Sequence, residues 1–409
     1  MRALLFLAPT LHPNMGLLSS KPQPLDPEQV ISKRLESSMA EAKAADRERV
    51  KVLLLGASDS GKSTLFKQMQ ILYGDGMSAR ERTDATPVVR RTTLGSMKGL
   101  VEQSEANGNA HYVQCKAEFA LVKDSAVDAK LDMVLGGAIK ALWADAAIRR
   151  TWDDRATFDQ VGVADSAALF FDKMDSIMAP DYAADEEDIL HCRVRTSNLH
   201  EATYTIAGTT CIFYDAGGLR HLDRSRWLHY FTGVDTVIYV ASLSEYDEML
   251  LEDNLQPRHV EALECFREIN QNSLFAKPRV VLCLNKSDLL KEKITRVPIR
   301  GARGGFLDFP IAGRAGDTVV KRGRYYTAAV KYFQTRFEAC AGESGLPITH
   351  ITCAVDGDSV RSLIDLLELS KVSKGEEKEE KEGGGKAKKA EKKERRRKGS
   401  ARSMSVDSA

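Results

Sequence analysis

The sequence predicts an α/β fold built on a doubly wound, mainly parallel sheet with an inserted all-α segment. Short, apolar, β-branched runs alternate with helical stretches, which is the pattern of βα units. Between roughly residues 75 and 188 no strand signal occurs, and Ala, Leu and charged residues recur there at helical spacing. A glycine-rich turn directly follows the first apolar run.

Five apolar runs are expected to form parallel strands, and a sixth run an exposed edge strand. The five runs are residues 52–55, 211–214, 236–241, 280–284 and 348–352. Residues 201–206 alternate in polarity, as an edge strand does. Residues 296–324 are rich in Gly and Arg and are expected to form a surface loop.

The composition excludes wholesale disorder. The chain has 409 residues, 43% hydrophobic and 29% charged, which is enough for a sizeable core in two or three domains. No apolar run reaches the roughly 20 residues of a membrane-spanning helix, and residues 3–7 lack a convincing cleavage site, so secretion is not expected. Seven cysteines without a CxxC pair indicate a reducing, cytosolic compartment.

The formal charge of +1 hides a difference between the body of the chain and its C-terminal end. Residues 371–409 hold 14 Lys/Arg against 8 Asp/Glu, a net of +6, which leaves −5 for the remaining 370 residues. An acidic body argues against nucleic-acid binding. The end itself lacks apolar anchors and is expected to be a disordered basic tail.

A flexible leader at residues 1–25 and an amphipathic helix at 26–49 are expected at the N-terminal end. Asp26 can cap the helix, Pro27 suits its first position, and Ile31, Leu35 and Met39 recur at helical spacing. Its apolar stripe is narrow, which favours a partner-binding arm over an isolated solvated helix.

The glycine-rich turn matches the phosphate-binding pattern G-x-x-x-x-G-K-[ST] between a predicted strand and a predicted helix. Gly56 and Gly61 permit a tight turn whose backbone N–H groups face phosphate oxygens. Lys62 would pair with the β and γ phosphates, and Ser63 would bind Mg²⁺. The expected contacts of this phosphate loop are Gly56, Asp59, Ser60, Gly61, Lys62, Ser63 and Thr64.

A second motif, Asn285-Lys286-Ser287-Asp288, follows the run at 280–284 and favours guanine. A carboxylate there accepts both the N1–H and the exocyclic amine of guanine, whereas adenine has no such donor pair. The motif ends a strand, where doubly wound sheets bind ligands. Cys353 and Ala354, from a later Thr-Cys-Ala sequence, are expected to join it.

Asp215-Ala216-Gly217-Gly218 ends another predicted strand. Asp215 is expected to reach Mg²⁺ through water. The Gly218 amide is expected to bond the γ-phosphate, because no side chain obstructs it. An ordinary Asp-Gly turn is the alternative.

Together these motifs resemble the heterotrimeric G-protein α subunit over about residues 26–369. The most specific part is residues 188–196, Asp-Ile-Leu-His-Cys-Arg-Val-Arg-Thr, which look like the family's first switch. The resemblance implies a P-loop GTPase (Ras-like) doubly wound sheet with an inserted all-α helical domain. The GTPase domain would occupy residues 50–74 and 189–370, and the helical domain residues 75–188.

The resemblance also implies roles for residues outside the motifs above. Arg193 is the arginine supplied in cis to the transferring γ-phosphoryl group, and Thr196 is the switch threonine that binds Mg²⁺. Leu190 adds a nucleotide contact. Asp165 and Ser166 look like the helical-domain pair that faces the nucleotide, with a simple helix cap as the alternative.

Two residues depart from the family's pattern. Asp59 stands where the family usually has glutamate, and its shorter side chain would weaken the pairing with Arg193. Leu219 stands where the family has the glutamine that orients the attacking water. Because leucine cannot hydrogen-bond water, slow hydrolysis and a long-lived GTP state are predicted. His221 is an alternative group for positioning the water.

The resemblance further implies a place at the cytoplasmic face of the plasma membrane, with a cytosolic fraction. Residues 15–20 match the N-myristoylation pattern, with Gly16 as the acceptor if translation starts at Met15. The implied partners are a βγ dimer, a G-protein-coupled receptor, effectors and GTPase-accelerating proteins. The basic tail replaces the C-terminus that usually engages receptors, which argues against ordinary receptor coupling. A lipid contact, a nuclear address or a merely solvated tail each explains the basic residues 386–398.

Three functions are compatible with a phosphate loop. The first is a signalling switch that binds GTP and is reset by slow hydrolysis, and the second is a GTP-bound scaffold that does not turn over. The third, a P-loop kinase or ATPase, is opposed by the guanine motif and the switch arginine. The first two share every binding residue, so the sequence does not separate them.

Overall fold

The computed structural model describes residues 37–38, 49–126, 128–155, 163–192, 199–216, 233–250, 256–272, 275, 277–302, 305–310, 319–341 and 347–367. Residues 1–49 form one unit, in which Ser37 and Ser38 are helical. The expected leader, nearly all of the expected N-terminal helix and the basic tail lie outside the described residues. The second unit begins at Val50.

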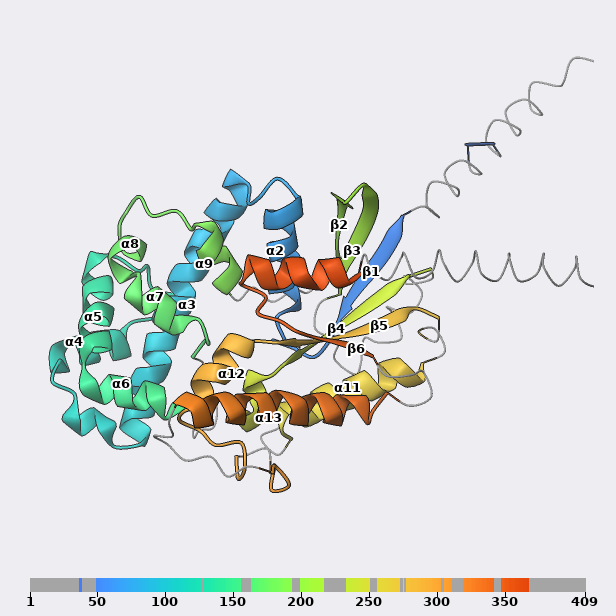
Figure 1. Cartoon of the computed structure of the whole chain (residues 1–409). Helices are drawn as coiled ribbons and strands as arrows, with labels where there is room; N and C mark the ends of the chain where they lie inside the picture. The colour runs from blue at the N-terminus through green and yellow to red at the C-terminus, as the bar shows by residue number, and fades with distance from the viewer. Residues whose placement is uncertain are drawn as a thin grey trace, which may run out of the picture. The chain divides into compact units, whose positions relative to one another are not determined.

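Among the described residues, the second unit is built on a six-stranded sheet with the order β2-β3-β1-β4-β5-β6 (Figure 1). The strands are β1 Val50–Leu55, β2 Leu199–Ile206, β3 Thr209–Ala216, β4 Thr236–Ser242, β5 Arg279–Asn285 and β6 Ile348–Ile351. β2 runs antiparallel to β3, and the other pairs are parallel. The expected parallel strands and the expected edge strand are all present, with slightly different ends.

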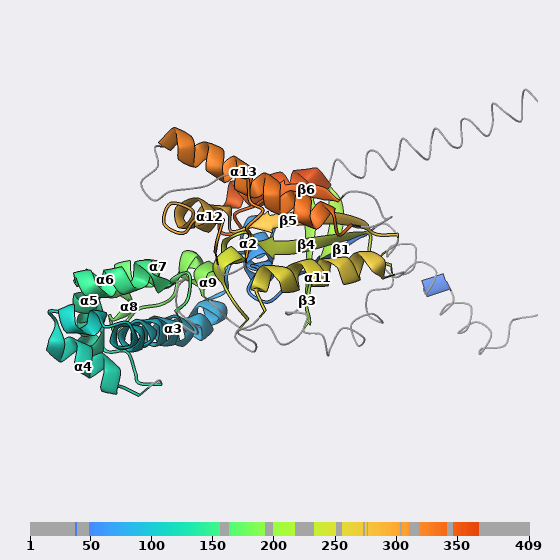
Figure 2. The same ribbon diagram turned by 90° about the horizontal axis from the view of Figure 1, so that it is seen from below.

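Each central strand contributes to two cores, because successive side chains point to opposite faces of a sheet. Leu53 and Leu55 belong to a core shared with α11 and α13, whereas Val52 and Leu54 belong to one shared with α2 and residues 357–367. These helices are α2 Lys62–Tyr73, α11 Arg258–Gln271 and α13 Val319–Glu338. Helices therefore cover both faces of the sheet, which confirms the doubly wound α/β class (Figures 1 and 2).

A third core is formed by helices alone, between α2 and β2 in the chain. The elements are α3 Ala79–Ala106, η1 Asn109–Tyr112, α4 Lys116–Asp124, α5 Met133–Ala144, α6 Ala146–Asp153, α7 Ala167–Asp172, α8 Met174–Ile177 and α9 Glu186–His191. Ile189 and Cys192 are buried in this core, so its packing extends beyond residue 188, where the helical segment was expected to end. In the described part of the chain, no helix has both the length and the apolarity needed to cross a bilayer.

The prediction of a surface loop at residues 296–324 is wrong in two respects. Helix α13 already begins at Val319. Ile299, Phe306 and Phe309 are buried in the core shared with α11 and α13. Glycine and arginine mark a loop in the sequence, but three apolar side chains anchor this one to the body of the protein. The other short elements are η3 Ser244–Asp247, α12 Ser287–Lys293 and a C-terminal helix at residues 357–367.

Candidate functional site

The residues of both nucleotide motifs lie at the carboxyl ends of two parallel strands, β1 and β5, which lie on either side of β4. The phosphate loop leaves β1 after Leu55, and Asp215 of β3 is paired with Leu54. Asn285 ends β5, opposite Ser242 of β4. Five strands thus direct their following loops to one edge of the sheet, which is where open α/β sheets bind ligands.

The phosphate loop adopts a backbone that only glycine allows at two positions. Gly56 and Gly61 have φ angles of 145° and 97°. A Cβ atom at Gly56 would lie 2.1 Å from the carbonyl oxygen of Val240, and one at Gly61 would lie 2.2 Å from Asn285 Nδ2. The loop is therefore held against β4 and β5, and α2 starts directly after it at Lys62.

Lys62 is buried beneath the phosphate loop. Its Nζ donates to the carbonyl oxygens of Gly56 at 3.0 Å and Ala57 at 2.6 Å. Burial lowers the pKa of this ammonium, while nearby carboxylates, with Asp215 the strongest, oppose the shift. A positive charge enclosed by loop carbonyls at a helix N-terminus is well placed to meet phosphate oxygens.

Ser63 and Asp215 meet beside the loop. Ser63 Oγ donates to Asp215 Oδ2 at 2.7 Å. The other carboxylate oxygen, Oδ1, is buried and has no hydrogen-bond partner within the described part of the protein. A hydroxyl and a carboxylate with a spare oxygen are hard donors that suit Mg²⁺, which typically keeps several waters and adds phosphate oxygens as ligands. The donor set therefore fits the expected ion.

Asn285 joins the phosphate loop to the expected base-binding loop. Its Nδ2 donates to the carbonyl oxygen of Ser60, and its Oδ1 accepts from the backbone N–H of Ala354, both at 2.9 Å. The side chain is only 2% exposed, so both bonds are shielded from water. One amide thus sets the spacing between the phosphate side and the base side of the site.

We expect Asn285→Ala to lower the free energy of unfolding by about 2–4 kcal/mol, because it leaves a buried carbonyl and a buried N–H without partners. Urea unfolding of the nucleotide-free and GDP-loaded protein measures this loss. Asn270→Ala, which removes a side-chain amide on α11 that donates one turn back to the carbonyl oxygen of Phe266, is the control. A loss no larger than that of the control would contradict the joining role.

The expected base-binding residues lie together after β5 and β6. Lys286 has a φ of 59°, a left-handed backbone that turns the chain sharply into α12, where Asp288 occupies the first turn. The backbone N–H of Ser287 donates to the carbonyl oxygen of Thr352 at 3.2 Å, which ties the two loops together. Burial, reinforced by the Asp288 carboxylate, raises the pKa of Cys353 to about 11, so the thiol stays protonated beside that carboxylate.

Asp165 reaches this site from the helical segment. Its Oδ2 accepts from Lys286 Nζ at 2.9 Å, and the Lys286 ammonium holds the pKa of Asp165 well below its usual range. Ser166 immediately precedes α7, and its side chain makes no capping hydrogen bond there, so the helix-cap alternative does not apply to it. The ion pair between Asp165 and Lys286 joins the helical segment to the guanine motif.

We expect Asp165→Asn to speed GDP release about 2- to 5-fold. The carboxylate is 39% exposed, and an ion pair at such a site is worth only about 0.2–1 kcal/mol. Stopped-flow release of a fluorescent GDP measures the rate. Asp175→Asn is the matched control, because Asp175 pairs with Lys140 inside the helical segment. Equal rates in all three proteins would contradict the prediction.

Arg258 is a residue of this site that sequence reasoning missed. Its Nη2 donates to the carbonyl oxygen of Ser58 at 2.9 Å and to Asp59 Oδ2 at 3.2 Å. It also pairs with Glu245, whose pKa burial raises to about 7 despite the nearby guanidinium. No sequence motif marks an arginine so far along the chain. The Asp59 side chain therefore contacts α11, whereas its expected partner Arg193 lies outside the described residues.

A protein-family model described as the G-protein alpha subunit matches residues 29–369. The chain belongs to the G-protein α-subunit family. It is 34% identical over 331 residues to the guanine nucleotide-binding protein alpha-4 subunit of Dictyostelium discoideum, covering 81% of this chain and 91% of that relative. It is also 34% identical over 341 residues to the guanine nucleotide-binding protein alpha-1 subunit of Caenorhabditis briggsae, covering 82% and 91%.

A third relative is the guanine nucleotide-binding protein subunit alpha of Cochliobolus heterostrophus, 32% identical over 338 residues, which cover 81% of this chain and 90% of the relative. Members of the family bind guanine nucleotides in signalling, act in general as GTPases with Mg²⁺, and generally partner with βγ subunits, receptors and effectors. The fold and the family membership therefore agree.

Several expected residues of a G-protein α subunit are outside the described part of this chain. They are Gly16, Arg193, Thr196, Gly218, Leu219 and His221. Leu190 is described and buried, and its carbonyl oxygen accepts from Thr64 Oγ1 at 3.4 Å. The described site thus holds the phosphate loop, the guanine motif and one side of the expected metal position.

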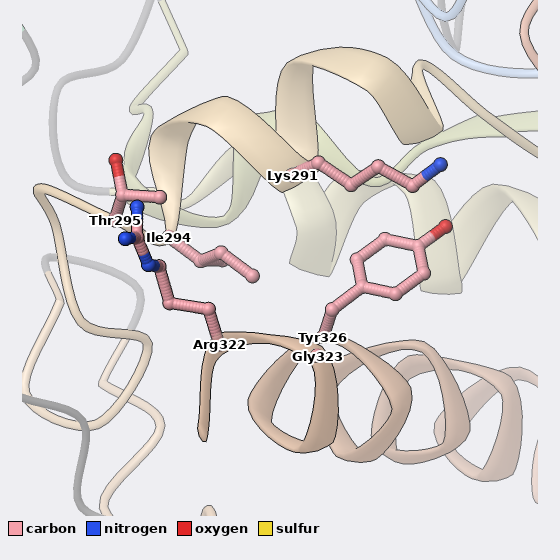
Figure 3. Close-up of a pocket in the computed structure, with 6 residues that line it drawn as sticks. All are labelled: Lys291, Ile294, Thr295, Arg322, Gly323 and Tyr326. Carbon is pink, nitrogen blue, oxygen red and sulfur yellow. The ribbon is translucent and has the colours of Figure 1, made fainter. Parts of the chain in front are cut away.

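A separate hollow of about 260 Å³ borders the guanine motif of this α subunit (Figure 3). It is lined by Lys291, Ile294, Thr295, Arg322, Gly323 and Tyr326, from α12, the residues that follow it and α13. In Figure 3 the side chains of Lys291 and Tyr326 extend toward each other. Burial raises the pKa of Tyr326, against a hydrogen bond to Ser287 of the motif. The lining contains none of the expected nucleotide contacts.

Proposed function

We propose that this G-protein α subunit is a GTP-binding signalling switch whose own hydrolysis of GTP is slow. The observation that carries the proposal is the pair of hydrogen bonds through which Asn285 links the phosphate loop to Ala354. That link holds the phosphate loop, with its cationic Lys62, at a set distance from the guanine motif, with its acidic Asp288. Leu219 stands where the family has the glutamine that positions water, and such a switch needs that group for rapid hydrolysis of GTP.

The binding steps follow from the side chains of the site. The Lys62 ammonium would exchange its bonds to loop carbonyls for bonds to phosphate oxygens, at little cost because it is already desolvated. Asp288 would accept the N1–H and amine of guanine. Ser63 would hold Mg²⁺ directly and Asp215 through water, with Thr196 as a further ligand. When bound, Mg²⁺ neutralises charge on the β and γ phosphate oxygens.

In hydrolysis, the proposed role of Arg193 is to stabilise charge that develops on the γ-phosphoryl group. An arginine in this position is worth about 10³ to 10⁵ in rate. Leu219 offers water neither a donor nor an acceptor, so the attacking water would lose the side chain that orients it in the family. The expected result is a GTP state that persists, with segments around Thr196 and Gly218 ordered by the γ-phosphate.

A GTP-bound scaffold remains the second candidate, because it would use the same binding residues. The scaffold is the function if Leu219 abolishes GTP hydrolysis altogether. The nucleotide that co-purifies separates the two: GDP supports the switch, and stoichiometric GTP supports the scaffold. Isothermal titration with guanosine and adenosine nucleotides tests both, because equal affinities would exclude either function.

We also propose that the protein acts at the cytoplasmic face of the plasma membrane, with a cytosolic fraction. Myristoylation of Gly16 would give only marginal membrane binding. A βγ dimer on the helix expected at 26–49, or the basic residues 386–398 on anionic lipid, would supply the second attachment. Co-sedimentation with vesicles that contain or lack anionic lipid, with and without βγ, distinguishes these contributions.

A further inference from the structure

The C-terminal end of α9 is held by side chains of α2. The last carbonyls of any helix lack partners within the helix. Here Lys67 Nζ donates to the carbonyl oxygens of Ile189 at 2.9 Å and Cys192 at 3.4 Å. Thr64 Oγ1 donates to the carbonyl of Leu190, between them, at 3.4 Å. Two side chains of α2 thus supply hydrogen-bond donors to the carbonyl groups at the end of α9.

The Lys67 contact is partly shielded from water and electrostatically favourable. Burial lowers the pKa of Lys67, and the nearby Cys192 opposes the shift. A cation at a helix C-terminus is stabilised by the helix dipole and by the free carbonyls. On the other side, Ile189 and Cys192 are buried in the helical core. The main chain at residue 192 is therefore fixed from both sides.

Lys67 lies on the same helix as the phosphate contacts, so it connects the C-terminal end of α9 to the phosphate site. Lys62 and Ser63 open α2 at the phosphate loop, and Lys67 lies five residues after Lys62 on the same helix, about 7.5 Å along its axis. The carbonyl that Lys67 holds at Cys192 belongs to the peptide group whose nitrogen is that of Arg193. One rigid helix therefore carries both the phosphate contacts and the attachment of the chain that leads into Arg193.

We propose that Lys67 is a positioning residue for Arg193. This inference rests on the proposed function, in which Arg193 stabilises the transferring phosphoryl group. Lys67 holds the carbonyl of residue 192 at a set distance from α2, and the next residue in the chain is Arg193. A misplacement of about 1 Å at a reacting group can cost about 10²-fold in rate. Ground-state nucleotide binding depends on other residues and should change little.

The test uses Lys67→Met, which keeps an unbranched apolar stem and removes the three donors. The full-length Leu219→Gln protein serves as the background, so that the rate is measurable. We expect single-turnover GTP hydrolysis to fall about 10- to 100-fold, with the Kd for GDP changed less than about 3-fold. In an Arg193→Ala background, Lys67→Met should cause no further fall.

Two variants control for a merely structural effect. Lys98→Met removes another lysine that satisfies the end of a helix, since Lys98 Nζ donates to the carbonyls of Val122, Lys123 and Ser125 within the helical segment. It should lower stability and leave hydrolysis unchanged. Lys67→Arg retains donors of similar reach and should restore most of the rate.

A second readout does not depend on turnover. GDP with aluminium fluoride mimics the transferring phosphoryl group, so its affinity should fall in Lys67→Met and fall further in Arg193→Ala, while the affinity for a non-hydrolysable GTP analogue stays the same. Unchanged aluminium fluoride affinity in Lys67→Met, together with a lowered affinity in Arg193→Ala, would overturn the inference. So would an equal loss of rate with and without Arg193. If Arg193→Ala itself keeps its aluminium fluoride affinity, the result counts against the proposed function.

Discussion

Replacing Leu219 by glutamine is expected to raise the single-turnover rate of GTP hydrolysis by about 10²-fold. Glutamine offers both a donor and an acceptor for the attacking water, and a positioned side chain that acts on a reacting proton is typically worth about 10²- to 10⁴-fold. Phosphate, Mg²⁺ and guanine are held by other residues, so the Kd for GTP should change less than about 3-fold. Release of inorganic phosphate from preloaded protein measures the rate.

Leu219→Met is the matched control, because it keeps an apolar side chain of similar volume and should leave the rate unchanged. Equal rates in the unaltered protein and in Leu219→Gln would refute the water-positioning argument. If the unaltered protein already hydrolyses GTP quickly, His221→Ala shows whether that histidine holds the water instead. A rate that falls in His221→Ala would reassign the role and remove the reason for a long-lived GTP state.

The second large effect is expected for recognition of the guanine base by Asp288. Asp288→Asn should weaken guanosine nucleotide binding about 10²- to 10⁴-fold, because two hydrogen bonds to a charged acceptor are each worth about 1.5–3 kcal/mol. An asparagine amide still accepts the N1–H but now presents a donor to the guanine amine. Xanthine carries a carbonyl oxygen in place of that amine, so xanthosine nucleotides should bind the variant better than guanosine nucleotides do.

Isothermal titration of the variant with GDP, XDP and ADP measures this change of preference. Asp358→Asn is the control, since this exposed carboxylate pairs with Arg361 at the start of the helix at residues 357–367. It should keep the guanosine preference. A preference that is unaltered in Asp288→Asn would mean that Asp288 does not face the base, and the assignment of guanine from the Asn285–Asp288 motif would fall.

The sequence was sufficient for the strands and for the phosphate loop, which depend on local periodicity and short spacing. Short apolar runs predicted the parallel strands around β1, and alternating polarity predicted the edge strand β2, because side chains on a strand repeat every two residues. The pattern at residues 56–64 predicted the phosphate loop, because its glycines are required by backbone geometry at Gly56 and Gly61. Leu219 was recognised by its departure from a known pattern.

Only the tertiary structure brought together residues that no spacing rule connects. Arg258 contacts the phosphate loop across 200 positions of sequence, and Lys67 contacts Cys192 across 125. Ile299 and Phe306 turn a loop-like sequence into a packed one. Such contacts arise where separate helices dock on the sheet, so their geometry depends on the whole packed core, whereas a strand or a glycine turn is specified by its own few residues.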